Sequence, residues 1–473
     1  MNRERAETYL RQLAEAELRR ARTLPAALVR TRQDTARLTL AAQALVAVGA
    51  VDAATADQIR AGLEVAVAVR QPSQVNQANP GGQRGLPPDA RMRLAGLMHS
   101  LPPAATVALP VSGLRAGHPR PAAPRPSRRA VPVGQVIRLR DGDVRRELLV
   151  VAYVQSADGA RFTTAGWPFR PFTPFTAADD RGASYQIGFG GEMRPRELLL
   201  RPDPSHQIRW LDLITAPGEP ATRIDLDPPI PVPQVTVTRN ATSPGELLLD
   251  VIAARILTWA ASPPGNAGQP AAANADLRAL VCDGPGDIVA ALYAAGALSP
   301  ASRVPGQLAG LCARLGIPGH GITAPPGNDL PERWRSMLTS YHRREPQAGP
   351  APGILAATAA KLPELDGAQI TILGLHHGER GTIVHMLASG VTLEGDWQYA
   401  RAVRPLPALW IRDSSGRWHA TSTNGVSPMW GDPREVMLWL AVMPPLDRGT
   451  GWIEVVATGS SAEVRARLPL SWE

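Results

Sequence analysis

Four histidines in the last third of the chain have the clearest potential for chemistry. They are His376, His377, His385 and His419. Imidazole nitrogens that converge at about 2.0 to 2.1 Å bind zinc, and neighbouring strands could bring several of these rings together. However, adjacent strand residues such as His376 and His377 point to opposite faces, and no cysteine or carboxylate recurs at ligand spacing. We therefore expect no metal and no cofactor, and a metal-dependent hydrolase built on these histidines is our third hypothesis.

Other catalytic signatures are missing from the sequence or have a structural role instead. Lys361 is the sole lysine, and it lies outside the G-K-[ST] pattern that binds nucleotide phosphates. Neither G-x-S-x-G nor H-E-x-x-H occurs. Cys282 and Cys312 have apolar helical neighbours and are typical of small buried hydrophobes. Asp179 and Asp180 fit a turn, where aspartate bonds backbone amides. The sequence thus favours a protein that is not an enzyme, and we assign no catalytic residue.

Three tryptophans lie in irregular, polar segments and are candidates for binding a partner. They are Trp167 in AGWPFRPF, Trp397 in EGDWQYAR and Trp430 in SPMWGDP. Loops at the end of a β-sandwich commonly recognise partners, and exposed aromatics near arginine have the composition of interface hot spots. The alternative is that these loop residues fold back over the edge of a sandwich.

The formal net charge of +8 is weak support for nucleic-acid binding. Nearly all positive residues are arginines in a chain rich in alanine, proline and glycine, which is typical of codon usage in a GC-rich genome. A proline-rich tether carries the four arginines best placed to bind phosphates. These nucleic-acid candidates are Arg120, Arg125, Arg128 and Arg129. Weak nucleic-acid binding is our second hypothesis.

Helical and β-type patterns alternate along the chain and must position all of these residues. Leu10, Leu13 and Ala14 recur at helical spacing, and Ser243 with Glu246 forms a capping box. Short β-type runs with turns every ~8 to 12 residues indicate antiparallel sandwiches. The predicted boundaries are a helical bundle over 1–70, a Pro/Arg-rich linker over 71–132, a β-sandwich over 133–238, a helical domain over 243–345, a linker over 346–359 and a second β-sandwich over 360–473. The predicted fold class is α+β multidomain, with two antiparallel immunoglobulin-like β-sandwiches alternating with two small helical bundles.

Internal matches indicate that one unit has been duplicated. FTAADDRGASY at 175–185 parallels LWIRDSSGRWH at 409–419, and both contain the D-x-x-G spacing of a type I turn. Trp210 and Trp452 each open a strand with an acid two residues later. A weaker match relates the helical segments, in which ALVAVGAVDAATA parallels ALYAAGALSPASR.

The D-x-x-G turn and the closing VRARLPLSW resemble those of uncharacterised proteins from high-GC actinobacteria. The resemblance spans most of the chain and implies no activity and no functional residue. No apolar run approaches the ~20 residues that span a bilayer, and the charged N-terminus differs from a signal peptide. We therefore expect no contact with membranes. The leading hypothesis is a non-enzymatic cytoplasmic adaptor or scaffold that binds protein partners through sandwich loops and helical bundles.

Overall fold

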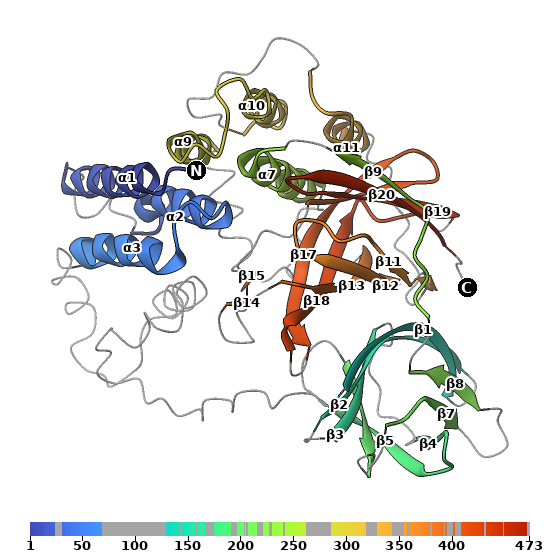
Figure 1. Cartoon of the computed structure of the whole chain (residues 1–473). Coiled ribbons are helices and arrows are strands. Elements are labelled where there is room, and N and C mark those ends of the chain that lie inside the picture. Colours follow the sequence, from blue (N-terminus) through green and yellow to red (C-terminus); the bar gives the residue numbers. More distant parts are fainter. Residues whose placement is uncertain are drawn as a thin grey trace, which may run out of the picture.

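A computed structural model of the chain describes residues 1–23, 31–68, 129–261 and 285–470, apart from short gaps. The gaps are 142–143, 157–158, 166–174, 191–195, 203, 205–206, 215–220, 227–228, 240–241, 318–328, 343–353, 357–358, 379–380, 392, 395–400, 403–407, 430–431 and 448. The described part is an α+β protein with two antiparallel sheets and a layer of helices (Figure 1).

The helices form where the apolar spacing and caps predict them. Their bounds are α1 (Arg3–Thr23), α2 (Thr31–Ala47), α3 (Ala53–Ala68), α7 (Pro244–Ala261), α9 (Gly286–Ala294), α10 (Val304–Arg314) and α11 (Glu332–His342). Asp52 caps α3 by accepting a hydrogen bond from the amide of Thr55 at 2.7 Å. The predicted capping box of α7 is confirmed, because the amide of Ser243 donates to Glu246 at 2.9 Å and the amide of Glu246 donates to the Ser243 hydroxyl at 3.3 Å.

The two helical segments share one apolar core, although two separate bundles were predicted. Leu10 and Leu45 from the first segment lie in the same buried cluster as Leu292 from the second. Arg37 on α2 also joins the segments, because its guanidinium makes two 2.6 Å hydrogen bonds to Asp287 on α9 and one of 3.0 Å to Glu17 on α1. Each segment alone would expose this apolar face, which explains why they pack together.

The first β region forms one continuous antiparallel sheet of eight described strands. These are β1 (Arg129–Asp141), β2 (Val144–Ser156), β3 (Gly159–Ala165), β4 (Phe175–Asp179), β5 (Ser184–Gly190), β6 (Arg196–Arg201), β7 (Trp210–Ile214) and β8 (Thr222–Asp225), in the order β1-β2-β3-β6-β5-β4-β7-β8. The side chain of Gln135 links the two edge strands, since it donates to the Arg223 carbonyl at 2.7 Å and accepts from the Asp225 amide at 3.2 Å. The sheet therefore curves into a barrel-like shape around its own core.

The second sheet contains ten described strands. They are β9 (Val235–Arg239), β10 (Ile354–Ala356), β11 (Ala360–Lys361), β12 (Gln369–Gly378), β13 (Gly381–Ser389), β16 (Ala408–Asp413), β17 (Trp418–Met429), β18 (Asp432–Met443), β19 (Trp452–Thr458) and β20 (Ala462–Pro469). Their order is β10-β12-β13-β18-β17-β16-β19-β20-β9, with β11 paired to β12. A separate hairpin pairs β14 (Leu393–Glu394) with β15 (Arg401–Ala402).

Three predicted boundaries need correction. Strand β9 was assigned to the first β region, but it pairs with β20 of the second sheet, with Val237 opposite Val464. Strand β10 lies inside the predicted linker 346–359, and β1 begins inside the predicted linker 71–132. Short strands in proline-rich surroundings carry little sequence signal of their own, because pairing with a partner strand far along the chain decides their structure. The immunoglobulin-like pairing of two facing sheets stays a prediction.

The two sheets have the same strand order. If β10, β12 and β13 are matched to β1, β2 and β3, and β16 to β20 are matched to β4 to β8, every neighbour relation in the first sheet recurs in the second. The residues at the matched hairpins also agree in register, since Asp212 is opposite Arg223 and Glu454 is opposite Arg467. The topology is thus shared by regions whose sequences differ at most positions.

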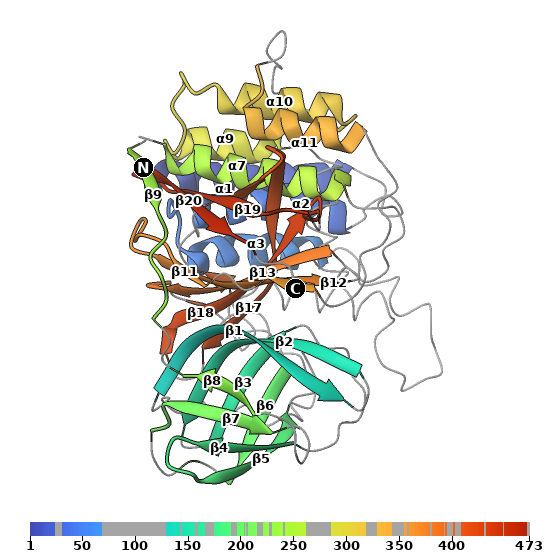
Figure 2. The same ribbon diagram turned by 90° about the vertical axis from the view of Figure 1, so that its right-hand side faces the viewer.

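The helical layer, the second sheet and the first sheet are stacked in that order (Figure 2). Trp410 on β16 lies in the helical core, so the outer face of the second sheet packs on the helices. On the opposite side, Leu149 and Val151 of β2 share a buried cluster with Leu373 of β12 and Leu387 of β13. Buried apolar contacts therefore join all three layers of the described chain.

Candidate functional site

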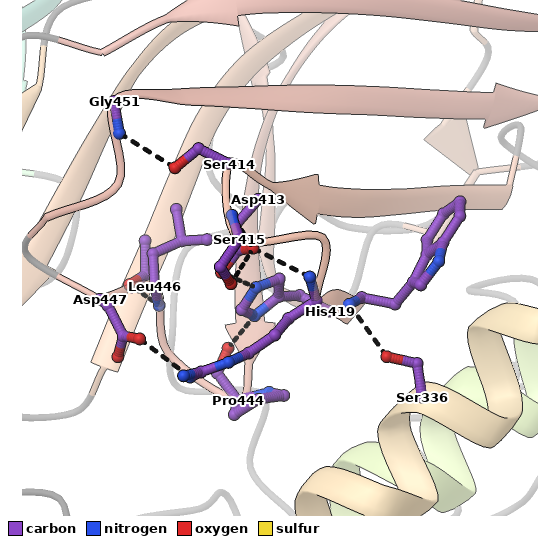
Figure 3. A network of polar contacts seen from close by, with 12 residues as sticks. Ser336, Asp413, Ser414, Ser415, His419, Pro444, Leu446, Asp447 and Gly451 are labelled. Atoms are coloured by element: carbon purple, nitrogen blue, oxygen red, sulfur yellow. Dashed lines mark hydrogen bonds and ion pairs between the residues drawn. The ribbon is translucent and has the colours of Figure 1, made fainter.

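A network of Asp, His and Ser side chains lies at the turn between β16 and β17 (Figure 3). The Asp413 amide donates to the Arg417 carbonyl at 2.9 Å, and the Gly416 amide donates to the Asp413 carbonyl at 2.9 Å. Gly416 has a φ of 85°, a conformation that glycine adopts readily and other residues do not. The D-x-x-G spacing therefore forms the turn that it predicts.

Both oxygens of the Asp413 carboxylate have polar partners at or next to this turn. Its Oδ1 accepts from the amides of Ser415 and Arg417, both at 2.9 Å, and from the Ser415 hydroxyl at 2.6 Å. Its Oδ2 lies 3.3 Å from Nε2 of His419. Burial acts to raise the pKa of Asp413, but the hydrogen bonds from His419, Ser415 and Arg417 outweigh it and hold that pKa well below its ordinary value.

Both ring nitrogens of His419 are also occupied. Nδ1 lies 2.7 Å from the carbonyl oxygen of Pro444, and Nε2 faces the Asp413 carboxylate. Both partners are oxygen atoms that accept hydrogen bonds. The ring is 1% exposed. His419 thus connects the β16–β17 turn to the chain after β18 from a buried position.

The arrangement differs from a catalytic triad although it contains the same residue types. In a triad the serine hydroxyl contacts the histidine, and the aspartate contacts the other ring nitrogen. Here the Ser415 hydroxyl donates directly to Asp413, and the second nitrogen of His419 faces a backbone carbonyl. The acceptor of the Ser415 hydroxyl is thus the carboxylate of Asp413, whose lowered pKa makes it a weak base, and the arrangement is not that of a Ser–His–Asp triad.

The matched turn of the first sheet repeats this network with a different aromatic residue. The Asp179 carboxylate accepts from the amides of Arg181 and Ala183 at 2.9 Å and from the Tyr185 hydroxyl at 2.6 Å. Tyr185 follows Asp179 by the same six residues that separate His419 from Asp413. The predicted turn role of Asp179 is therefore confirmed. Asp180 lies beside it and accepts from the Arg209 amide at 3.1 Å.

A second buried acid, Asp250 on α7, joins the helical layer to the second sheet. Its Oδ1 accepts from the indole nitrogen of Trp334 at 2.9 Å, and its Oδ2 accepts from the indole nitrogen of Trp410 at 2.8 Å. Arg333 on α11 pairs with the same carboxylate at 3.0 Å and reaches Glu463 on β20 at 3.7 Å. Sequence reasoning missed this residue. The signal was an acid between apolar residues in the middle of a helix, since a carboxylate at such a place needs buried donors.

The four predicted histidines do not converge on one point. His376 lies on the outer face of the second sheet, whereas His377 points the other way and bonds the Thr382 hydroxyl at 2.8 Å. His385 is 3% exposed and makes no hydrogen bond through either ring nitrogen, and its ring centre lies 6.5 Å from that of His376. Within the described chain, no three His, Cys, Asp or Glu residues are grouped so as to hold a metal ion.

The other predicted site residues have mixed outcomes. Several of them lie outside the described residues, namely Trp167, Trp397, Trp430, Arg120, Arg125, Arg128 and Cys282. Arg129 is the first residue of β1, and its guanidinium donates to the carbonyls of Ile208 and Leu226. Arg129 therefore belongs to the first sheet and not to the predicted linker 71–132. Cys312 is buried, and burial raises its thiol pKa to about 11, which makes it a poor nucleophile at neutral pH.

Two further findings concern the chain as a whole. None of the described helices combines the length and the apolar character needed to cross a membrane. Comparison of the chain with protein-family models, curated proteins and solved structures finds no match.

Proposed function

We propose that the chain is a non-enzymatic cytoplasmic adaptor that holds a protein partner on a rigid three-layer platform. The observation that carries the proposal is the repeated turn network. The Asp413 turn has a counterpart in the first sheet, in which Tyr185 takes the place of His419 and no acid–base chemistry on a histidine is possible. A role in fixing the turn explains both networks, and catalysis would explain only one.

An exposed sheet edge supports a binding role. Strand β9 ends the strand path of the second sheet, and its central residue Val237 is 53% exposed. Val232, just before the strand, is 71% exposed. Edge strands offer unpaired backbone groups to an extended segment of another protein. We assign this edge as the docking site of the proposed adaptor.

The test is quantitative affinity capture from the native cytoplasm, with proline placed in β9. Alternate residues of an edge strand send their N–H groups toward the neighbouring strand or away from it. Of V237P and T238P, one therefore weakens pairing with β20, and the other removes only an outward donor. We expect the wild type to capture a partner at stoichiometric level. Of the two proline variants, the one that keeps wild-type stability should no longer capture this partner. Absence of any stoichiometric partner in repeated captures would refute the adaptor proposal.

The same observations support an internal duplication of the β modules. The strand orders match, and so do two details at the hairpins that Trp210 and Trp452 open. Arg223 stacks over Trp210 at 3.8 Å, and Arg467 stacks over Trp452 at 3.9 Å. We infer that one ancestral module gave rise to both. In one module the turn aspartate is bonded by tyrosine and in the other by histidine, so the duplicated feature is the turn itself.

A further inference from the structure

His385 is buried at the contact between the two sheets, and neither of its ring nitrogens makes a hydrogen bond. It lies on β13 with Leu387, two residues along on the same side, and Leu387 belongs to the buried cluster that includes Leu149 of the first sheet. Directly opposite His385 are Gly374 on β12 and Trp439 on β18. A Cβ on Gly374 would lie 2.8 Å from Leu149, so the sheets are in close contact beside the ring.

The surroundings of His385 allow only a neutral imidazole. The described cluster beside it across the junction is made of apolar side chains such as Leu149, and the titratable group that acts on His385 is His376 on β12. Burial is the main cause that lowers the pKa of His385, to about 3, and repulsion from His376 adds to it. A protonated ring would be a buried charge without a counter-ion, which the protein avoids by exposing it.

We propose that the contact between the first and second sheets is a pH-sensitive junction, which opens when His385 takes up a proton. At pH 7.5 the ring is neutral in both the closed and the open arrangement, so the junction is closed by its apolar contacts. Below the ordinary pKa of about 6.5, an exposed ring binds a proton and the buried ring does not. Proton binding then favours the open arrangement, and the effect continues down to the lowered pKa of about 3.

The connections between the layers permit such an opening. The described chain between the two sheets is the short segment from Leu226 to β9, which includes residues 229–234. The apolar cluster lies between β2 and the outer face of the second sheet, and β1 also approaches β12, where a Cβ on Gly134 would lie 2.8 Å from the Leu373 carbonyl oxygen. Separation of the sheets exposes this cluster and leaves the interior core of each sheet intact.

The test measures how often the junction opens, from the rate at which a buried thiol is modified. Val151 on β2 is 0% exposed and belongs to the junction cluster, so V151C reports its opening. At each pH, the modification rate of the folded protein is divided by the rate of the same thiol in the urea-unfolded protein. Peptide mass spectrometry identifies the modified position. The open population is expected to rise roughly tenfold per pH unit below 6.5, which gives about 30-fold at pH 5.0.

Three variants in the V151C background locate the effect. H385L, with H385M as a second apolar replacement, should abolish the rise. H377Q is the matched control, because His377 lies on the same strand pair but faces the other side and bonds Thr382; it should keep the rise. A rise that persists in H385L or H385M, or no rise in the V151C parent, would overturn the proposal.

Two more measurements distinguish opening of the junction from global unfolding and from metal binding. L198C places the probe inside the first sheet, away from the junction, where modification requires unfolding of that sheet. An equal rise for L198C would mean global unfolding and would overturn the proposal. Elemental analysis of the purified protein should find no transition metal that depends on His385, because a nitrogen bound to a metal cannot take up a proton; a stoichiometric metal lost in H385L would also overturn it.

Discussion

The strongest single test of how the layers are joined is removal of the Asp250 carboxylate. In D250A, the indole N–H groups of Trp334 and Trp410 lose their acceptor. These residues are only 1% and 0% exposed, so water cannot replace it. A buried donor without an acceptor costs roughly 1 to 3 kcal/mol. Arg333 loses its closest carboxylate as well, and the solvent exposure of its side chain, 21%, reduces that contribution.

The sum of these losses is a decrease in unfolding free energy of about 4 kcal/mol for D250A, from two indole donors and one part-exposed ion pair. D250N keeps one carbonyl oxygen for one indole, so we expect about half of that loss. The matched control is D212A, because Asp212 makes a bidentate pair at 2.9 Å with Arg223, whose side chain is 54% exposed. Exposed pairs of this kind contribute little to stability.

The assay is urea unfolding followed by far-ultraviolet circular dichroism at pH 7.5. It is read as the shift in midpoint for D250A, D250N and D212A relative to the wild type. The predicted ranking places D250A as the least stable, D250N between, and D212A close to the wild type. If D250A loses no more stability than D212A, Asp250 does not join the helical layer to the second sheet in the way described.

Three further predictions concern the turns and the helical core. G390A should cost about 3 kcal/mol or more, because its Cβ would overlap the backbone oxygen of Gly367. G49A meets open space and should lose only about 1 kcal/mol for its positive φ, and thermal unfolding of both variants checks this. R37M should lower the urea midpoint by an amount that corresponds to about 1 to 3 kcal/mol of unfolding free energy, because it removes the part-buried link between the helical segments. An unchanged midpoint would count against the shared core. Because the pKa of Asp413 is lowered in the folded protein, its carboxylate contributes stability above the unfolded pKa of about 3.9, and this stability is lost as pH falls below that value. The unfolding free energy of D413N should therefore depend less steeply on pH between pH 5 and 2 than that of the wild type. An equally steep dependence in D413N would contradict the assignment.

Local signals predicted much of the fold. The capping box at Ser243 and Glu246 and the apolar spacing at Leu10 and Leu13 act within a few residues, so the sequence contains everything needed to account for them. The D-x-x-G turns are local in the same way, since Asp413 bonds amides two and four residues on. These elements were predicted with their correct types.

Partners far apart in the chain were not predictable in the same way. Strand β9 is a short β-branched run whose neighbour β20 lies more than 200 residues later, and nothing local distinguishes it from a strand of the first sheet. The shared helical core depends on Arg37 reaching Asp287 across a separation of 250 residues. By contrast, strand alternation is local, and the sequence already indicated that His376 and His377 point to opposite faces, as they do in the structure.

The most direct test of the binding role compares partner capture by the wild type, H419Q and the β9 proline variant that keeps wild-type stability. Glutamine can donate a hydrogen bond to Asp413, but it cannot transfer a proton as histidine does. The expected result is that H419Q captures the partner at wild-type stoichiometry and that the β9 variant does not. A folded H419Q protein that fails to capture the partner, together with a β9 variant that still captures it, would contradict both the structural role of the turn and the binding role of the edge strand.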